Sequence, residues 1–350
     1  MKFNSLGNTD IKVSKICLGT MTWGEQNTQD EAFEQMDYAL DAGINFFDTA
    51  ELYPVPPMAE TYTATETIIG NWLSSRKSRD KIILASKIAA RSDWTPHIRG
   101  DNACLDKKNI TQAIEGSLKR LQTDYLDLYQ LHWPDRETNY FGELAYKHSA
   151  NSGAPDAGAH IEETLEVLGD LVTQGKIRHI GLSNETPWGA MKFLQLADSL
   201  GLPRIVSIQN PYSLLNRTFE IGLAEVAMRE KCGLLAYSPL GFGVLSGKYL
   251  NNQKPANGRI TLYERFSRYS NTQGVLATEA YVNIAKKHQL DPSQMALAYV
   301  NSREFLTSNI IGATNMTQLK NNIESINLVL SDEILMEIEE TQVRHPNPCP

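Results

Sequence analysis

The chain has 350 residues, 41% of them hydrophobic and 21% charged, a composition that excludes a mainly disordered protein. Its 41 acidic and 33 basic residues give a net charge of −8, which argues against nucleic acid or an anionic membrane as a partner. The length fits either two ordinary domains or one large α/β domain.

The cysteines and the apolar runs indicate the compartment. Cys17, Cys104, Cys232 and Cys349 form no CxxC pair and no zinc-type spacing with histidine, so we expect reduced thiols and no metal. No apolar run reaches the ~18–20 residues of a membrane span, and the N-terminal residues turn polar at once, unlike a signal peptide. These features predict a soluble, cytoplasmic protein; they say nothing about its oligomeric state.

Short apolar runs alternate with helical periods along the chain. Residues 2–14 predict a hairpin that turns at Gly7-Asn8. Strands are expected at 15–19, 45–48, 82–87, 126–132, 179–183, 205–209, 234–237 and 309–312. Helices are expected at 30–42, 66–74, 109–121, 161–173, 187–200, 219–230, 274–288, 316–326 and 331–341.

The alternation predicts the architecture. Strands that are apolar almost throughout are typical of parallel strands buried on both faces. Eight of them, each followed by a helix, fit one (β/α)₈ TIM barrel over residues 1–350, although a doubly wound sheet shares the pattern. Two long loops, 134–160 and 241–273, follow the fourth and seventh strands, and in a barrel both would lie at the carboxyl face, where active sites are built.

Four chemically active side chains stand at or just after predicted strand ends. Asp48 ends the second strand, Tyr53 follows it, Lys87 ends the third strand and His132 ends the fourth. Singly, such residues are more often caps, packing or surface groups. Together they would converge on one rim of a barrel, where a charge in a partly dry cleft must be paired.

The four residues make chemical sense as an acid site for carbonyl reduction. The ordinary pKa of a phenol, near ~10, is too high for ready proton donation, and an adjacent ammonium lowers it. Asp48 would hold Lys87 charged, Tyr53 would protonate the developing alkoxide, and His132 would orient the carbonyl oxygen. Such a reaction needs a hydride donor.

The motifs Phe47-Asp48-Thr49-Ala50-Glu51-Leu52-Tyr53, Ala85-Ser86-Lys87 and Leu131-His132-Trp133-Pro134 resemble the tetrad of the aldo-keto reductase superfamily. The likeness runs from Leu18-Gly19-Thr20 to Asn322 and is nearest to the bacterial Tas-like reductases and the potassium channel β-subunit branch. It implies a barrel oxidoreductase, NADP(H) as hydride donor, Tyr53 as general acid, Lys87 and Asp48 as its tuning pair, His132 as the orienting residue, and Gly19 and Thr20 at the cofactor.

Residues at later strand ends could hold that cofactor. Ser183, Asn184 and Gln209 can bind a nicotinamide carboxamide, although Asn184 could equally cap a helix, and Tyr237 could stack on the ring or belong to the core. No GxGxxG motif follows the first strand, which argues against a Rossmann site. The family likeness favours cofactor binding for these residues.

The segment after the seventh strand is rich in glycine and ends in a cation. Glycines let a backbone approach a pyrophosphate, and the segment matches the channel-β-like pattern. The candidate contacts are Ser238, Pro239, Leu240, Gly241, Gly243, Leu245, Ser246, Gly247 and Lys248. The resemblance adds Arg259 as a second cation for the adenosine 2′-phosphate.

After the eighth strand the sequence departs from the commoner family pattern. Many members carry Lys-Ser and then Arg as a 2′-phosphate clamp, where this chain has Gly312, Ala313 and Gln318. Lys248 and Arg259 would compensate, as in the channel-β-like branch, so NADPH is still expected. Thr314 and Asn322 are further candidate contacts, and Asn321 could accept a bond from the adenine amino group.

The substrate is expected to be a small aldehyde or ketone. Trp23, Trp94 and Trp133 are candidate walls of its pocket, although aromatic residues often serve only packing. Two other functions remain open from the sequence: a nucleotide-binding sensor of channel-β type with slow turnover, and a Schiff-base aldolase that uses Lys87, which Asp48 would disfavour by keeping the amine protonated.

Overall fold

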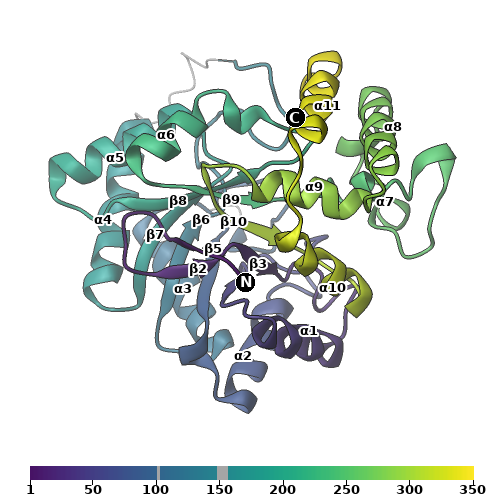
Figure 1. Ribbon diagram of the computed structural model, residues 1–350. Helices are drawn as coiled ribbons and strands as arrows, with labels where there is room; N and C mark the ends of the chain where they lie inside the picture. Colours follow the sequence, from purple (N-terminus) through teal and green to yellow (C-terminus); the bar gives the residue numbers. More distant parts are fainter. Residues whose placement is uncertain (101–102, 148–156) are drawn as a thin grey trace.

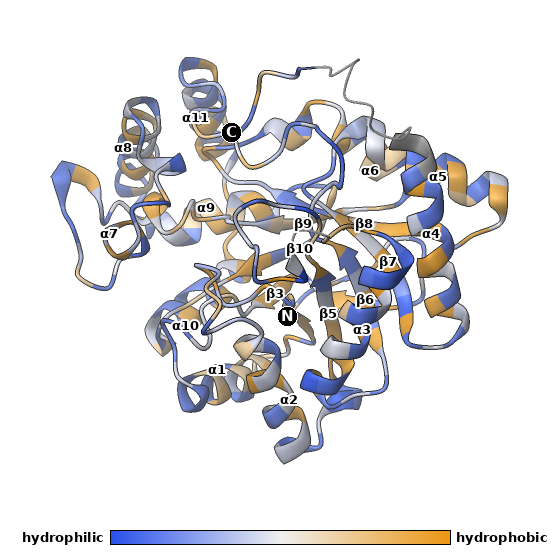
Figure 2. Cartoon of the chain, turned by 180° about the vertical axis from the view of Figure 1, so that it is seen from behind, coloured by the Kyte–Doolittle hydropathy of each residue, from blue (hydrophilic) through white to orange (hydrophobic). Residues whose placement is uncertain are grey.

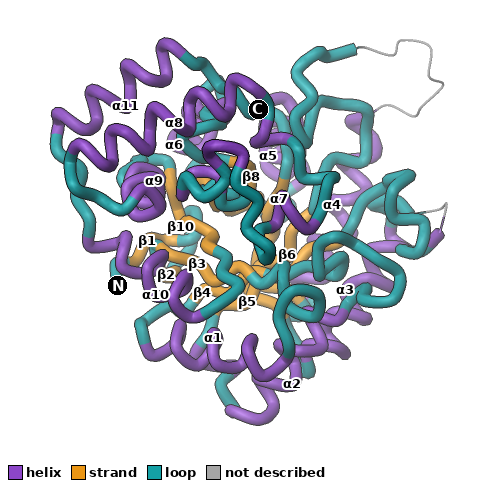
Figure 3. Tube along the Cα trace, turned by 90° about the vertical axis from the view of Figure 1, so that its right-hand side faces the viewer, coloured by secondary structure: helices purple, strands orange, loops and turns teal. Residues whose placement is uncertain are grey.

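The computed structural model describes residues 1–100, 103–147 and 157–350. Eight parallel strands form a closed barrel in the order β10-β3-β4-β5-β6-β7-β8-β9 (Figures 1 and 3). The strands are β3 (Ile16–Gly19), β4 (Phe46–Asp48), β5 (Ile83–Ile88), β6 (Leu126–Leu131), β7 (Ile177–Ser183), β8 (Ile205–Pro211), β9 (Leu234–Tyr237) and β10 (Leu306–Ile311). The predicted TIM barrel is therefore confirmed, and the doubly wound sheet is excluded.

Helices surround the barrel. They are α1 (Gln29–Asp41), α2 (Ala64–Arg76), α3 (Lys107–Leu121), α4 (Ala157–Thr173), α5 (Pro187–Leu200), α6 (Leu223–Glu230), α7 (Arg259–Leu262), α8 (Thr272–Lys287), α9 (Pro292–Asn301), α10 (Met316–Glu324) and α11 (Asp332–Arg344). Figure 2 shows the apolar strands inside this ring of helices, whose surfaces mix polar and apolar residues. No helix in the described ranges is long and apolar enough to cross a membrane.

Helix α9 was not predicted, because its sequence lacks an amphipathic period. Eight of its ten residues, all except Pro292 and Gln294, are buried, so apolar side chains occur all round the helix instead of along one stripe. The sequence nevertheless carries the features of a helix start. The Asp291 side chain accepts a hydrogen bond from the Gln294 backbone N–H at 2.9 Å, and Pro292 occupies the first turn.

The N-terminal hairpin closes the amino end of the barrel. Its strands β1 (Phe3–Ser5) and β2 (Lys12–Ser14) pair antiparallel, and Leu6 and Val13 are fully buried in a cluster with residues from seven barrel strands. At Gly7 (φ +61°) a Cβ atom would lie 2.7 Å from the Val206 carbonyl oxygen, so only glycine allows this approach. The hairpin thus seals the end opposite the candidate site.

The long loop after β9 covers the carboxyl end of the barrel. It contains α7 and several 3₁₀ turns, and in Figure 3 α7 and its flanking loops lie in front of the strands. The loop after β6 contributes Phe141 and Gly142 to the same end. Residues 148–156 of the predicted 134–160 insertion lie outside the described residues.

Candidate active site

A cavity of about 850 Å³ lies at the carboxyl ends of the strands. Asp48 ends β4, Tyr53 lies in the loop after it, and His132 directly follows β6; all three line the cavity. Lys87, near the end of β5, lies behind Tyr53 and is fully buried. The structure therefore brings together the four residues that the sequence singles out.

Lys87 connects the acid pair to the phenol. Its Nζ lies 2.6 Å from Asp48 Oδ2, 2.8 Å from the Thr49 carbonyl oxygen and 3.4 Å from the Tyr53 hydroxyl. Burial works to lower the pKa of Lys87, but Asp48 and Tyr53 outweigh it and the pKa is raised. Lys87 is thus a fixed ammonium whose three donors are used.

Asp48 also receives two amide donors on its other oxygen. Gln209 Nε2 lies 2.8 Å and Gln130 Nε2 3.1 Å from Asp48 Oδ1, and Gln209 Nε2 also donates to Gln130 Oε1 at 3.0 Å. Gln130 was not predicted. The available signal is a long polar side chain inside the apolar run 126–131, where a fully buried amide needs partners.

The environments of Tyr53 and His132 shift their pKa values in opposite directions. Burial raises the pKa of Tyr53 above its ordinary value, although the Lys87 ammonium pulls it down. The expected direction of the lysine effect is therefore right, but the expected net lowering is wrong, because burial is the larger effect. Burial, helped by Lys87, holds the pKa of His132 well below its ordinary range, so the imidazole is neutral at pH 7.

The loop that carries Tyr53 is anchored by a buried carboxylate. Glu51 accepts a bond from the Ala89 backbone N–H at 2.7 Å and pairs with the Arg99 guanidinium at 2.7 Å. These contacts join the loop after β4 to the segment after β5. The His132 ring packs edge-on against the Tyr53 ring at 5.8 Å, and its Nδ1 is buried without a partner among the described residues.

Four predicted cofactor residues form one network with His132 beside this centre. Tyr237 donates its hydroxyl to Asn184 Oδ1 at 2.6 Å, and Asn184 Nδ2 donates to the His132 carbonyl oxygen at 2.9 Å. Ser183 Oγ donates to the Gln209 carbonyl oxygen at 2.8 Å. All five line the cavity, and Asn184 has a left-handed backbone (φ +54°) between β7 and α5, so it is not the cap of that helix, which is Thr186.

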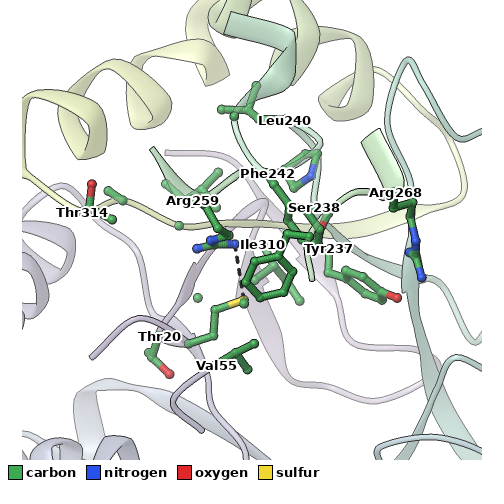
Figure 4. A pocket seen from close by; sticks show the side chains of 18 of the residues that line it. Thr20, Val55, Tyr237, Ser238, Leu240, Phe242, Arg259, Arg268, Ile310 and Thr314 are labelled. Carbon is green, nitrogen blue, oxygen red and sulfur yellow. Dashed lines mark hydrogen bonds between the residues drawn. The ribbon is translucent and has the colours of Figure 1, made fainter. Parts of the chain in front are cut away.

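Lys248 and Arg259 line the cavity, and Arg259 is near enough to Tyr53 for its charge to lower the pKa of that phenol. Neither has an ion-pair partner within 4.0 Å among the described residues. Arg259 instead contacts Met21 Sδ at 3.9 Å and lies over the Phe242 ring at 5.5 Å (Figure 4). Burial lowers the pKa of both groups, and Arg259 lowers that of Lys248 further, so the pair is poised for an anion.

The glycine-rich loop contributes to the wall in part. Ser238, Pro239, Leu240, Gly243 and Ser246 line the cavity, and a Cβ at Gly243 (φ +87°) would lie 3.0 Å from Lys248 Nζ. Three other predicted residues of this loop are not among those that line the cavity, and cofactor contact for them stays a prediction. Leu245 is buried in the core, and Gly241 (φ +53°) and Gly247 (φ +79°) turn the chain against Tyr269 and Val282.

The residues after β10 line the end of the cavity near Arg259. They are Gly312, Thr314, Gln318, Asn321 and Asn322, with Gly19 and Thr20 from the end of β3 nearby in the same lining. A Cβ at Gly312 would meet nothing within 4 Å, which leaves room there. Asn321 Oδ1 already accepts a bond from Gln294 Nε2 at 2.9 Å, so an adenine contact through this oxygen would have to share it.

Aromatic side chains form the wall near His132. Trp133 is fully buried with its ring 5.0 Å from the His132 ring, and Trp94 packs against it at 5.1 Å. Phe141, from the long loop after β6, packs on Trp133 at 6.0 Å. The expectation for Trp23 is wrong: it is fully buried beside α1, its indole donates to Gln35 Oε1 at 3.3 Å, and it does not line the cavity.

Further residues of the cavity wall were not predicted from the sequence. They lie in loops, where no hydrophobic period and no motif indicates which way a side chain points. They are Met21, Gln26, Asn257, Arg265, Phe266, Ser267, Arg268 and Asn271. The charged ones, Arg265 and Arg268, follow Arg259 by only a few residues.

The fold and the site define a barrel oxidoreductase with a buried Asp–Lys–Tyr centre and a neighbouring histidine. The chain belongs to the aldo/keto reductase family, whose family model matches residues 15–342. It is 54% identical to Protein tas of Escherichia coli over the full length of both chains. It is also 34% identical to the uncharacterized oxidoreductase YrpG of Bacillus subtilis, over 96% of this chain and 94% of that protein. An aldo-keto reductase of Babesia bovis is 39% identical over 75% of this chain and 95% of its own.

Proposed function

We propose that this protein reduces aldehydes or ketones to alcohols with NADP(H) as the hydride donor. The observation that carries the proposal is the Tyr53 hydroxyl, which lies in the cavity wall 3.4 Å from the ammonium of a buried Lys87–Asp48 pair. A phenol so held can give its proton to an oxygen that becomes negative during hydride transfer. Membership of the aldo/keto reductase family supports the same reaction class.

Each member of the tetrad has a role in that step. Tyr53 donates its proton to the alkoxide oxygen, and Lys87 stabilises the phenolate that remains. Asp48 keeps Lys87 charged. His132, neutral because burial depresses its pKa, can donate one ring N–H to the carbonyl oxygen and orient it toward Tyr53.

The cavity residues fit a reduced nicotinamide dinucleotide phosphate, which when bound supplies the hydride. Lys248 and Arg259, cations without a carboxylate partner among the described residues, would hold its 2′-phosphate. Asn184 and Gln209 offer amide groups for the carboxamide, and Tyr237 offers a ring face. Asp48 and Gln130 accept both N–H bonds of the Gln209 amide. The Gln209 Oε1 atom is therefore the one that would accept a hydrogen bond from the carboxamide.

The arrangement of Lys87 argues against the aldolase alternative. Its ammonium donates to Asp48, to the Thr49 carbonyl oxygen and to Tyr53, and its pKa is raised, so the free amine that Schiff-base formation needs is disfavoured. A slow nucleotide sensor would share the cofactor residues and differ in its rate of turnover.

A carbonyl panel assayed with NADPH and with NADH tests the proposal. We expect steady turnover of aldehydes with NADPH and poorer use of NADH. A preference for NADH would overturn the role of Lys248 and Arg259. Oxidation of bound NADPH at a rate too slow for multiple turnovers, with every substrate, would favour the sensor.

A further inference from the structure

The charge on the cavity wall is unbalanced. Its charged side chains in the described ranges are four cations, Lys248, Arg259, Arg265 and Arg268, and one acid, Asp48, which Lys87 already neutralises. Lys248 and Arg259 suffice for the phosphate of the proposed cofactor. Arg265 is exposed and can be solvated by water, but Arg268 is half-buried and needs another explanation, because a cation in a partly dry wall is costly without an anion.

Arg268 lies apart from the phosphate cations. In Figure 4, Arg259 is on the side of Tyr237 where Thr20 and Thr314 lie, and Arg268 is on the opposite side. Arg268 is half-buried and has no carboxylate within 4.0 Å among the described residues. Although burial works to lower it, the pKa of Arg268 is raised by the phenols of Tyr269 and Tyr237, so the guanidinium stays charged.

Contacts link Arg268 to the aromatic wall rather than to the phosphate end. A Cβ at Gly142 would lie 3.2 Å from the Pro350 oxygen and 3.4 Å from Arg268 Nε, so the guanidinium borders the loop after β6 and the last residue of the chain, which also lines the cavity. The adjacent Phe141 packs on Trp133, whose ring lies 5.0 Å from His132. Arg265, exposed, lies over the Trp94 ring at 5.8 Å on the same side. The two arginines therefore flank the place where a substrate body would lie.

We propose that the substrate is an aldehyde or ketone that bears a carboxylate, and that Arg268 binds this carboxylate while Trp94, Trp133 and Phe141 contact the apolar body. The single charge of a carboxylate matches one half-buried guanidinium, and the planar fork of arginine suits its two oxygens. Arg265 at the rim also attracts the carboxylate, but it contributes less to the binding free energy than Arg268 because it is exposed to solvent. The inference rests on the proposed carbonyl reduction and specifies its substrate class.

Matched substrates and variants test this inference. The kcat/KM with NADPH is measured for 4-formylbenzoate and for its uncharged methyl ester, in the wild type, Arg268→Met and Arg265→Met. We expect the wild type to favour the acid, and Arg268→Met to lower kcat/KM for the acid about 10- to 100-fold, mainly through KM, with the ester little changed. Arg265→Met, the matched control, should change the acid by only a few fold.

A binding arm separates this inference from the proposed function. The reduction product 4-hydroxymethylbenzoate, which cannot react while the protein holds NADPH, is titrated by calorimetry into the NADPH-loaded wild type and Arg268→Met, and the uncharged benzyl alcohol is titrated in parallel. Weaker binding of the acid alone in the variant supports the role of Arg268, even if neither aldehyde is reduced. Equal affinity for 4-hydroxymethylbenzoate in the two proteins overturns it. An equal loss of kcat/KM for the acid and the ester in Arg268→Met overturns it as well. Absence of turnover with every carbonyl compound counts against the proposed function instead.

Discussion

Lys87 Nζ lies 2.6 Å from Asp48 Oδ2, and the side chains of both residues are at most 2% exposed. The pair also holds Tyr53 through the third contact of the ammonium. A buried ion pair of this kind is weak as a source of stability, but loss of one partner leaves the other charge uncompensated. Its position beside a phenol is what makes it useful.

Lys87→Met should therefore cost both stability and turnover. The uncompensated Asp48 carboxylate predicts a loss of about 3–5 kcal/mol in the free energy of unfolding, measured by urea denaturation. The double variant Asp48→Asn/Lys87→Met, with both charges removed, should regain most of that stability but no carbonyl reduction. A double variant as unstable as the single one would show that the loss comes from packing rather than from charge.

Gln130→Leu tests the amide network around Asp48. The variant removes a donor to Asp48 Oδ1 and the acceptor that fixes the orientation of the Gln209 amide. We expect NADPH to bind several fold more weakly in a fluorescence titration, and the free energy of unfolding to fall by about 1–3 kcal/mol. Gln130→Glu, which keeps the shape and the acceptor but adds a charge next to Asp48, should be worse than Gln130→Leu. Unchanged NADPH affinity in both variants would show that Gln130 does not position Gln209 for cofactor binding.

The depressed pKa of His132 predicts a dependence of stability on pH. The folded protein keeps this ring neutral, whereas the unfolded chain protonates it below about pH 6.5, so stability is lost as the pH falls below that value. Relative to His132→Gln, the wild type should lose about 1.4 kcal/mol between about pH 7.5 and about pH 5.5 in urea denaturation. A difference that stays constant over this range would mean that His132 titrates normally in the folded protein.

Substitution of the two phosphate cations should change the preference between cofactors. Lys248→Met and Arg259→Met each remove a charge without a carboxylate partner, and each should raise KM for NADPH about 10-fold or more. The KM for NADH, which lacks the 2′-phosphate, should change little. Equal losses for both cofactors would assign these residues to the shared pyrophosphate or to the loop itself.

The sequence predicted the barrel and the tetrad because both depend on local patterns. The reactive polar residues stand at the ends of the apolar runs, and in a barrel the carboxyl ends of the parallel strands meet on one rim. For the same reason Asp48, Lys87 and His132 could be brought together without coordinates. Helix α9 was missed because a helix buried all round has no amphipathic period.

The direction of individual side chains was less predictable. Trp23 and Trp133 look alike in the sequence, yet Trp23 points into the core and Trp133 lies at the cavity, since loop geometry alone decides between them. Gln130 acquires its role only when β4, β6 and β8 place Asp48 and Gln209 around it. Arg268 lies in an irregular loop, and only the folded chain puts it next to Gly142.

The central claim is that Tyr53 donates the proton in carbonyl reduction. Its most direct test compares the wild type with Tyr53→Phe, which keeps the ring, in aldehyde-dependent NADPH oxidation, with NADPH affinity measured in parallel by fluorescence titration. We predict that Tyr53→Phe binds NADPH as the wild type does and loses about 10²- to 10⁴-fold in kcat. A variant that reduces aldehydes at the wild-type rate would contradict the account.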